Sequence, residues 1–284
     1  MNFYIVIPAH NEEAFIGDML NSIVAQSLRP NKVVVVNDAS TDDTQKIINQ
    51  FSEKYNFIES IFLDSEKVHE PGSKVVNAFY KGLETLDTNF DLIGKFDADL
   101  ILPPNYFEKV LQLFASDEKI GLAGGNLYIE KDDAWEFEAI SEKTKVRGPI
   151  KLYRKACFEE IGGLKNSIGW DTVDGLLALY NGWNIRTDTS LRVKHLKPTG
   201  KSYTKASKYR QGEAFYKMRY GFSLTWIASL KLALKKKDFQ NFKDSIKGYN
   251  KAKNNKLDYL VSEKEGEFIR KLRWGKIRKK LGIL

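Results

Sequence analysis

Two aspartates separated by one residue, Asp97 and Asp99, stand where an apolar run ends and shortly before a Pro-Pro pair. In an extended chain, residues i and i+2 point to the same side, so both carboxylates face one way. Adjacent carboxylates repel each other, and a divalent cation that prefers oxygen ligands, such as Mg²⁺ or Mn²⁺, relieves that repulsion. An isolated Asp-x-Asp is also typical of a solvated acidic turn. The elements around the pair must decide between these two interpretations.

The first hundred residues alternate between apolar runs and amphipathic segments. Continuous apolar runs predict strands, because strands covered on both faces of a parallel sheet carry few polar residues. The alternation of strand and helix predicts an α/β fold with a mostly parallel central sheet flanked by helices. The expected strands are residues 3–8, 32–36, 58–63 and 91–96, and the helices between them include residues 15–24, 47–51 and 73–83.

Polar side chains follow three of these strands. Asn11 and Glu12 follow the first strand, Asp38 follows the second, and Asp97 and Asp99 follow the fourth. The carboxyl ends of parallel strands meet at one edge of the sheet, where ligands bind, so we expect these groups to converge. The first strand is followed neither by Gly-x-Gly-x-x-Gly nor by a Gly-Lys-Ser/Thr loop. The sequence therefore argues against a dinucleotide-binding fold and a P-loop nucleotidase.

Three motifs together carry a family resemblance. They are Ile-Pro-Ala-His-Asn-Glu-Glu at 7–13, Val-Val-Asn-Asp-Ala-Ser-Thr-Asp-Asp-Thr at 35–44 and Phe-Asp-Ala-Asp at 96–99. In order and spacing they resemble family 2 inverting glycosyltransferases of the GT-A fold, over roughly residues 3–200. The resemblance implies a divalent metal (Mn²⁺ or Mg²⁺) and a nucleotide-sugar donor, with a UDP-sugar expected and a GDP-sugar as the alternative. It also implies a glycan or lipid-linked acceptor hydroxyl, in polysaccharide or cell-surface glycan assembly.

The resemblance assigns a nucleotide-sugar site by position. It implies that Pro8, Ala9 and Glu12 line the nucleotide pocket and that Asp38 accepts a hydrogen bond from the base. Lys74 stands where the family often has a basic residue, so it either contacts the diphosphate or is a lysine of the helix surface.

The resemblance also assigns the metal ligands. It implies that Asp99 ligates the metal on the diphosphate and that Asp97 lies near the ribose or the metal. His195 follows a predicted short strand at a position where GT-A relatives carry a histidine, so it is either a third metal ligand or a structural residue. A cation bridging the phosphates would stabilise the negative charge of a departing nucleoside diphosphate.

An inverting transfer needs a carboxylate that takes the proton from the attacking hydroxyl. The family usually has Glu-Asp near a helix start with a glycine eleven residues after the Asp, and Asp171 and Gly182 have that separation. We therefore expect Asp171 to be the general base, although it can also stabilise the helix N-terminus. Asp174, one turn later, is the rival base. Trp170 replaces the usual Glu, which is a departure from the family.

Trp135 and Phe137 lie in an acidic and aromatic segment, residues 132–142, that follows a Gly-rich strand-like run. Aromatic rings in this region can stack on a sugar or a prenyl chain. We expect both side chains to belong to the core instead.

The 284 residues suit one large α/β domain with an extension, and the sequence divides into a GT-A catalytic domain at 1–200 and a basic helical extension at 201–284. The single cysteine fits a reducing compartment. The N-terminus lacks the basic start of a signal peptide, and no apolar run approaches the roughly 20 residues of a membrane span. These features predict a cytoplasmic protein.

Charge is unevenly distributed along the chain. Residues 216–284 hold 19 Lys and Arg against 6 Asp and Glu, a balance of +13, whereas residues 1–215 have a balance of −5. Apolar residues spaced three and four apart among the basic residues of 273–284 are typical of an interfacial helix. The tail therefore predicts docking on the catalytic domain together with peripheral contact to an anionic membrane surface.

Two other functions remain open from the sequence. A sugar nucleotidyltransferase can share a similar sheet but needs a Gly-rich basic loop near the first strand, where residues 9–13 are acidic instead. A non-catalytic module could bind an anionic polymer such as nucleic acid through the basic tail. The acidic body and the three motifs disfavour nucleic acid as a partner.

Overall fold

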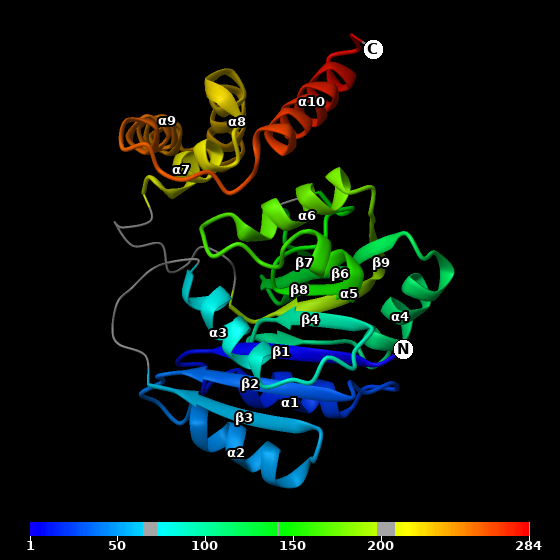
Figure 1. The fold of residues 1–284 in the computed structure, drawn as a ribbon. Helices are drawn as coiled ribbons and strands as arrows, with labels where there is room; N and C mark the ends of the chain where they lie inside the picture. Colours follow the sequence, from blue (N-terminus) through cyan, green and yellow to red (C-terminus); the bar gives the residue numbers. More distant parts are fainter. Residues whose placement is uncertain (65–72, 141, 198–207, 284) are drawn as a thin grey trace.

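The computed structural model describes residues 1–64, 73–140, 142–197 and 208–283. Within these residues nine strands form one sheet, in the order β3-β2-β1-β4-β8-β6-β9-β5, with β7 paired to β6 and helices around the sheet (Figure 1). The strands are β1 (Phe3–Ala9), β2 (Lys32–Asp38), β3 (Ile58–Leu63), β4 (Leu92–Phe96), β5 (Leu100–Ile101), β6 (Ile120–Lys131), β7 (Ala134–Phe137), β8 (Ile150–Arg154) and β9 (Asn184–His195). The helices are α1 (Ile16–Val24), α2 (Thr44–Lys54), α3 (Ser73–Glu84), α4 (Tyr106–Ser116), α5 (Lys155–Glu160), α6 (Trp170–Tyr180), α7 (Arg210–Lys217), α8 (Gly221–Lys236), α9 (Phe239–Asn254) and α10 (Glu263–Lys280).

The N-terminal half of the sheet is parallel. β1 lies between β2 and β4, and β3 extends the sheet beyond β2, with all three pairs parallel. The four valines at 33–36 are completely buried, because sheet neighbours and flanking helices cover both faces. The continuous apolar runs thus predicted these four strands correctly.

The C-terminal half of the sheet is mixed. β8 runs antiparallel to both β4 and β6, whereas β6 and β9 are parallel. At the far edge the two-residue strand β5 pairs antiparallel with the end of β9. The expectation of a mostly parallel sheet therefore holds for the first half only. The prediction that Trp135 and Phe137 are core residues is wrong, since both side chains on β7 are only half-buried.

The four C-terminal helices gather above α6, on the opposite side of the molecule from α2 (Figure 1). The rings of Tyr180 on α6 and Phe268 on α10 meet edge to face at 5.5 Å. Lys217 Nζ donates to Ser167 Oγ at 3.3 Å, just before α6. The expected boundary between residues 200 and 201 lies outside the described residues, so the division into two domains stays a prediction. None of the described helices combines the length and the apolarity that crossing a bilayer requires.

Helices α7 and α9 cross with almost no space between their backbones. A Cβ atom at Gly248 would lie 2.0 Å from the carbonyl oxygen of Tyr209, and one at Gly212 would lie 1.8 Å from that of Ser245. Real atoms do not approach this closely, so an alanine at either position must push the helices apart.

We predict that Gly248→Ala lowers the free energy of unfolding by about 1–3 kcal/mol because of this overpacking. Helix propensity alone predicts the opposite, a gain of about 1 kcal/mol. Gly275→Ala is the control, since a Cβ there meets no atom of the described residues within 4 Å. Urea unfolding measures both variants, and a Gly248→Ala protein as stable as Gly275→Ala would contradict the close crossing.

Candidate functional site

The loops after β1 and β2 are joined by hydrogen bonds at the carboxyl edge of the sheet. The Asn11 amide donates to Ser40 Oγ at 2.9 Å, and Asn11 Oδ1 accepts from the Thr41 amide at 2.8 Å. The Glu12 amide donates to Thr44 Oγ1 at 2.8 Å. Asn11 itself has a φ of 52°, a left-handed conformation that Asn tolerates better than most residues. These bonds hold the polar residues of both loops in place.

The predicted nucleotide-binding residues lie on these two loops and on α3. Ala9 ends β1 and Asp38 ends β2, and both residues are buried. The half-buried Pro8 pairs in register with Val36. Lys74 is half-buried in the first turn of α3. Their roles toward a nucleotide stay predictions.

Glu12 connects the first loop to the segment after β9. Its Oε1 accepts from Lys197 Nζ at 2.9 Å. Burial raises the pKa of Glu12, Lys197 opposes that increase, and the charges of Asp99 and Asp97 add to it. Glu12 therefore lies in the electrostatic field of the acidic pair, as convergence at one edge requires.

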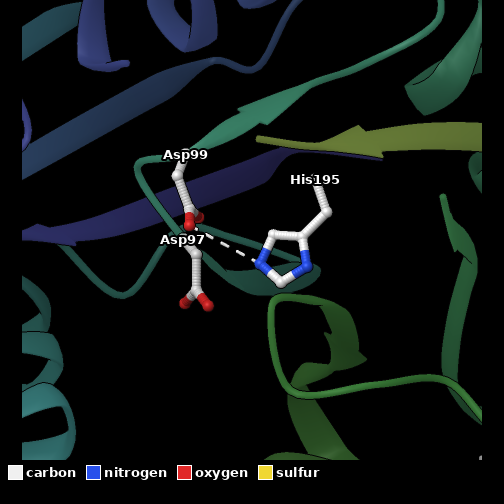
Figure 2. A group of neighbouring side chains, drawn as sticks. All are labelled: Asp97, Asp99 and His195. Carbon is white, nitrogen blue, oxygen red and sulfur yellow. Dashed lines mark ion pairs between the residues drawn. The ribbon is translucent and has the colours of Figure 1, made fainter. Parts of the chain in front are cut away.

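Asp97, Asp99 and His195 form one cluster (Figure 2). One ligand atom from each side chain lies within 4.8 Å of the others, and His195 Nε2 is 3.5 Å from Asp99 Oδ2. Strand pairing brings them together, since Leu100 on β5 is directly opposite His195 on β9. Next to this pair, the Leu196 amide donates to the Asp99 carbonyl at 2.9 Å. Two carboxylates and an imidazole are suitable ligands for Mn²⁺ and related divalent ions.

A second carboxylate holds the other side of the His195 ring. His195 Nδ1 is 2.9 Å from Glu138 Oε2, and Arg147 forms an ion pair with the same oxygen. Burial lowers the pKa of His195, but its hydrogen bonds to Asp99 and Glu138 outweigh that effect and raise the pKa to about 9. Sequence reasoning missed Glu138, although it stands in the acidic and aromatic segment at 132–142.

Two buried lysines lie side by side beneath the site. Lys95 on β4 is directly opposite Lys151 on β8, and both side chains are at most 2% exposed. Lys95 forms an ion pair with Asp97. The Trp170 ring lies within 6 Å of both ammonium groups, at 5.2 Å from Lys95 and 5.6 Å from Lys151. Trp170 thus supplies a cation–π contact to both lysines at the position where the family usually has Glu.

Lys151 also forms hydrogen bonds with the first turns of α6. Its Nζ lies 2.6 Å from both carboxylate oxygens of Asp174 and donates to the Asp171 carbonyl at 2.5 Å. Tyr153 donates to Asp174 as well, and burial followed by the Asp174 charge raises the pKa of this phenol. Asp174 is completely buried, which argues against its role as the rival base, because a base must reach its substrate.

Asp171 lies in the first turn of α6 and is half-buried. The N-cap is Gly169, and no side chain caps this helix by a hydrogen bond, so Asp171 is not the cap residue. Gly148 packs against it, since a Cβ there would be 3.0 Å from the Asp171 Cβ. Burial lowers the pKa of the neighbouring Lys145, and the Asp171 charge opposes that change.

Comparison with known proteins decides the family. Residues 4–166 match the model described as Glycosyl transferase family 2, which is more than half of the chain. The protein belongs to this family. A probable glycosyltransferase of Bacillus subtilis, YdaM, is 32% identical over 212 residues, which are 64% of this chain and 47% of YdaM. Poly-beta-1,6-N-acetyl-D-glucosamine synthase of Staphylococcus aureus is 24% identical over 179 residues, 62% of this chain and 38% of the synthase.

Solved structures share the fold of this family 2 chain. S. aureus TarS 1–349 in complex with UDP-GlcNAc matches with a TM-score of 0.58 and 18% identity, over 82% of this chain and 67% of TarS. The mannosyltransferase PcManGT of Pyrobaculum calidifontis, in complex with GDP-Man and Mn²⁺, matches with a TM-score of 0.57 and 15% identity, over 94% and 78%. The expected GT-A fold is confirmed. The chain spans less than half the length of the curated relatives it matches.

We predict that breaking the buried pair between Lys151 and Asp174 destabilises the fold strongly. Lys151→Met leaves a buried carboxylate without its counter-ion, so the free energy of unfolding should fall by about 3–5 kcal/mol. Asp174→Asn should cost a similar amount, and the double variant should lose less than the sum.

Denaturant unfolding of the three variants tests this coupling. Lys81→Met is the control, because Lys81 and Glu84 form an exposed ion pair whose loss should change stability little. The buried network would lose its structural role if Lys151→Met were as stable as Lys81→Met.

Proposed function

We propose that this protein is a metal-dependent inverting glycosyltransferase that transfers a sugar from a UDP-sugar to a hydroxyl of a glycan or lipid-linked acceptor. The observation that carries the proposal is the cluster of Asp97, Asp99 and His195 at the carboxyl edge of the sheet. Membership of a glycosyltransferase family supports this reaction over the sugar nucleotidyltransferase and the non-catalytic module.

The cluster fits a divalent cation by its donor set. Asp99 and His195 are buried and fixed by the β5–β9 pairing, whereas Asp97 is partly exposed toward the edge and balanced by Lys95. Asp99 and His195 would hold the ion, and Asp97 would take the ribose or share the ion. When bound, Mn²⁺ or Mg²⁺ would neutralise charge on the phosphates of the donor.

The base is Asp171 in this proposal. Asp171 lies in the first turn of α6 and is only half-buried, and its charge acts on the neighbouring Lys145. The acceptor hydroxyl gives its proton to Asp171 and attacks the anomeric carbon as the nucleoside diphosphate departs, so the sugar inverts its configuration. Lys151 positions Asp171 through the backbone carbonyl.

Two comparisons support a UDP-sugar as donor. TarS 1–349 is seen in complex with UDP-GlcNAc and, in another crystal, with UDP. The curated relative from S. aureus is named a poly-beta-1,6-N-acetyl-D-glucosamine synthase. Because PcManGT is seen in complex with GDP-Man, a GDP-sugar stays the alternative donor. We therefore propose a role in polysaccharide or cell-surface glycan assembly.

Asp99→Ala and Asp171→Asn should separate donor binding from chemistry. Asp99→Ala should abolish Mn²⁺-dependent UDP binding in calorimetry together with UDP release from UDP-GlcNAc. Asp171→Asn should keep that binding but slow UDP release by about 10²–10⁴-fold, since only proton transfer is lost. Asp18→Asn, on the exposed face of α1, is the control. Equal release rates in wild type and Asp171→Asn would refute the base, and unchanged UDP binding in Asp99→Ala would refute the metal site.

Glu138→Gln should weaken metal binding without unfolding the protein. The carboxylate beside Nδ1 orients the ring and makes His195 a better ligand, and loss of such a partner typically costs 10–100-fold in metal affinity. Electron paramagnetic resonance of Mn²⁺ in the presence of UDP measures that affinity directly. Glu136→Gln on the exposed side of β7 should bind as the wild type does. Matching affinities in the two variants would mean that Glu138 only pairs with Arg147.

A further inference from the structure

Helices α8 and α9 form a hairpin with an open, mostly apolar groove between them. The groove has a volume of about 420 Å³. Trp226 on α8 and Phe242 on α9 meet edge to face across it at 5.6 Å. The residues that line the groove are Phe222, Trp226, Phe242, Lys243, Ile246, Lys247 and Asn250.

Large apolar side chains of this hairpin reach solvent. Phe222 is 52% exposed, Trp226 45%, Leu234 59% and Phe239 62%. Phe239 precedes the groove residues Phe242, Lys243 and Ile246 by three, four and seven positions, so it lies on the same face of α9. Exposed aromatic and aliphatic residues gathered in this way mark an interaction surface.

The same hairpin is strongly basic. Residues 221–254 contain eight Lys and two Asp, with no Arg or Glu. Both aspartates have other partners than the lysines that line the groove. Asp238 caps α9 by accepting from the backbone amides of Gln240 and Asn241, and Asp244 is buried and accepts from Gln240 Nε2 at 2.9 Å. The apolar groove is therefore rimmed by positive charge.

We propose that the α8–α9 face docks on an anionic phospholipid bilayer, with Phe222, Trp226 and Phe239 at the boundary between headgroups and acyl chains and with Lys243 and Lys247 on the lipid phosphates. Lysines on an amphipathic surface keep their charge at the headgroups while their stems cover apolar area. Phe and Trp beside them suit the same depth. Leu234 and Ile246 add aliphatic surface, which suits acyl chains and does not stack on nucleic-acid bases.

The hairpin is linked to the catalytic half of the chain. Lys235 on α8 donates to the Ile140 carbonyl at 3.2 Å, two residues beyond Glu138. α10 connects the extension to α6 through Phe268 and Tyr180. A bilayer bound at α8–α9 would therefore be in contact with a protein whose catalytic half is attached to that hairpin, which suits an acceptor carried on a lipid.

Vesicle co-sedimentation tests the surface with the full chain. The wild type should bind vesicles of phosphatidylcholine and phosphatidylglycerol at 7:3 but not pure phosphatidylcholine, and high salt should release it. Lys243→Glu/Lys247→Glu should bind at least about 25-fold more weakly, at about fivefold per lysine. Lys46→Glu/Lys54→Glu on α2 carries the same change in net charge and should bind as the wild type does.

A second arm tests insertion of the apolar side chains. Phe239→Ser should lower vesicle affinity about tenfold, whereas Phe62→Ser, 53% exposed on β3, should not change it. Lipids brominated on the acyl chain should quench the tryptophan fluorescence of the wild type more than that of Trp226→Phe. Circular dichroism checks that each variant is folded.

Three outcomes would overturn the proposal. They are no binding of the wild type to the anionic vesicles, equal binding of the α8–α9 variants and their controls, and binding to a single-stranded RNA oligonucleotide in place of vesicles. Vesicle binding is measured without turnover, so it succeeds or fails independently of the proposed glycosyl transfer.

Discussion

The site depends on the pairing of two strand ends that lie almost a hundred residues apart. β5 has only two residues, and its partner is the end of β9, so this short ladder places Leu100 opposite His195. The bond from the Leu196 amide to the Asp99 carbonyl completes it. Because the acidic loop is held between β4 and β5, the fold sets the direction of its carboxylates. This is the preorganisation that the proposed metal site requires.

The buried charges next to that ladder are balanced by opposite charges. The sheet register puts Lys95 opposite Lys151, which would repel each other without partners. Asp97 and Asp174 supply one counter-charge each, and the Trp170 ring covers both ammonium groups. Since Lys151 also holds the Asp171 carbonyl, the same network connects the acidic loop to the start of α6. Trp170 therefore helps to stabilise the two buried ammonium groups of the site.

Local patterns predicted much of this architecture. Runs such as Val33–Val36 indicated buried parallel strands, and the carboxyl ends of those strands brought Glu12 near the field of Asp97 and Asp99 as expected. Local patterns could not predict β5, Glu138 or the pairing of Lys151 with Asp174. Each of these depends on contacts between segments far apart in the sequence: an antiparallel strand pair for β5, the Glu138–His195 contact and the packing of α6 on β8. Such contacts leave no periodic signal in the chain. The expected core position of Trp135 failed for the same reason, since β7 lies off the main path of the sheet.

Thermal unfolding with nucleotide and metal tests the proposed metal-dependent donor site. The wild type is heated with UDP or GDP, each with Mn²⁺ or with EDTA. A ligand at 100 times its dissociation constant adds about 2.7 kcal/mol of stability, which raises the midpoint by several degrees. We expect a rise of the midpoint with UDP and Mn²⁺ that EDTA abolishes. An equal rise in EDTA would contradict the metal site at Asp97, Asp99 and His195, and no rise with either nucleotide would contradict the donor site itself.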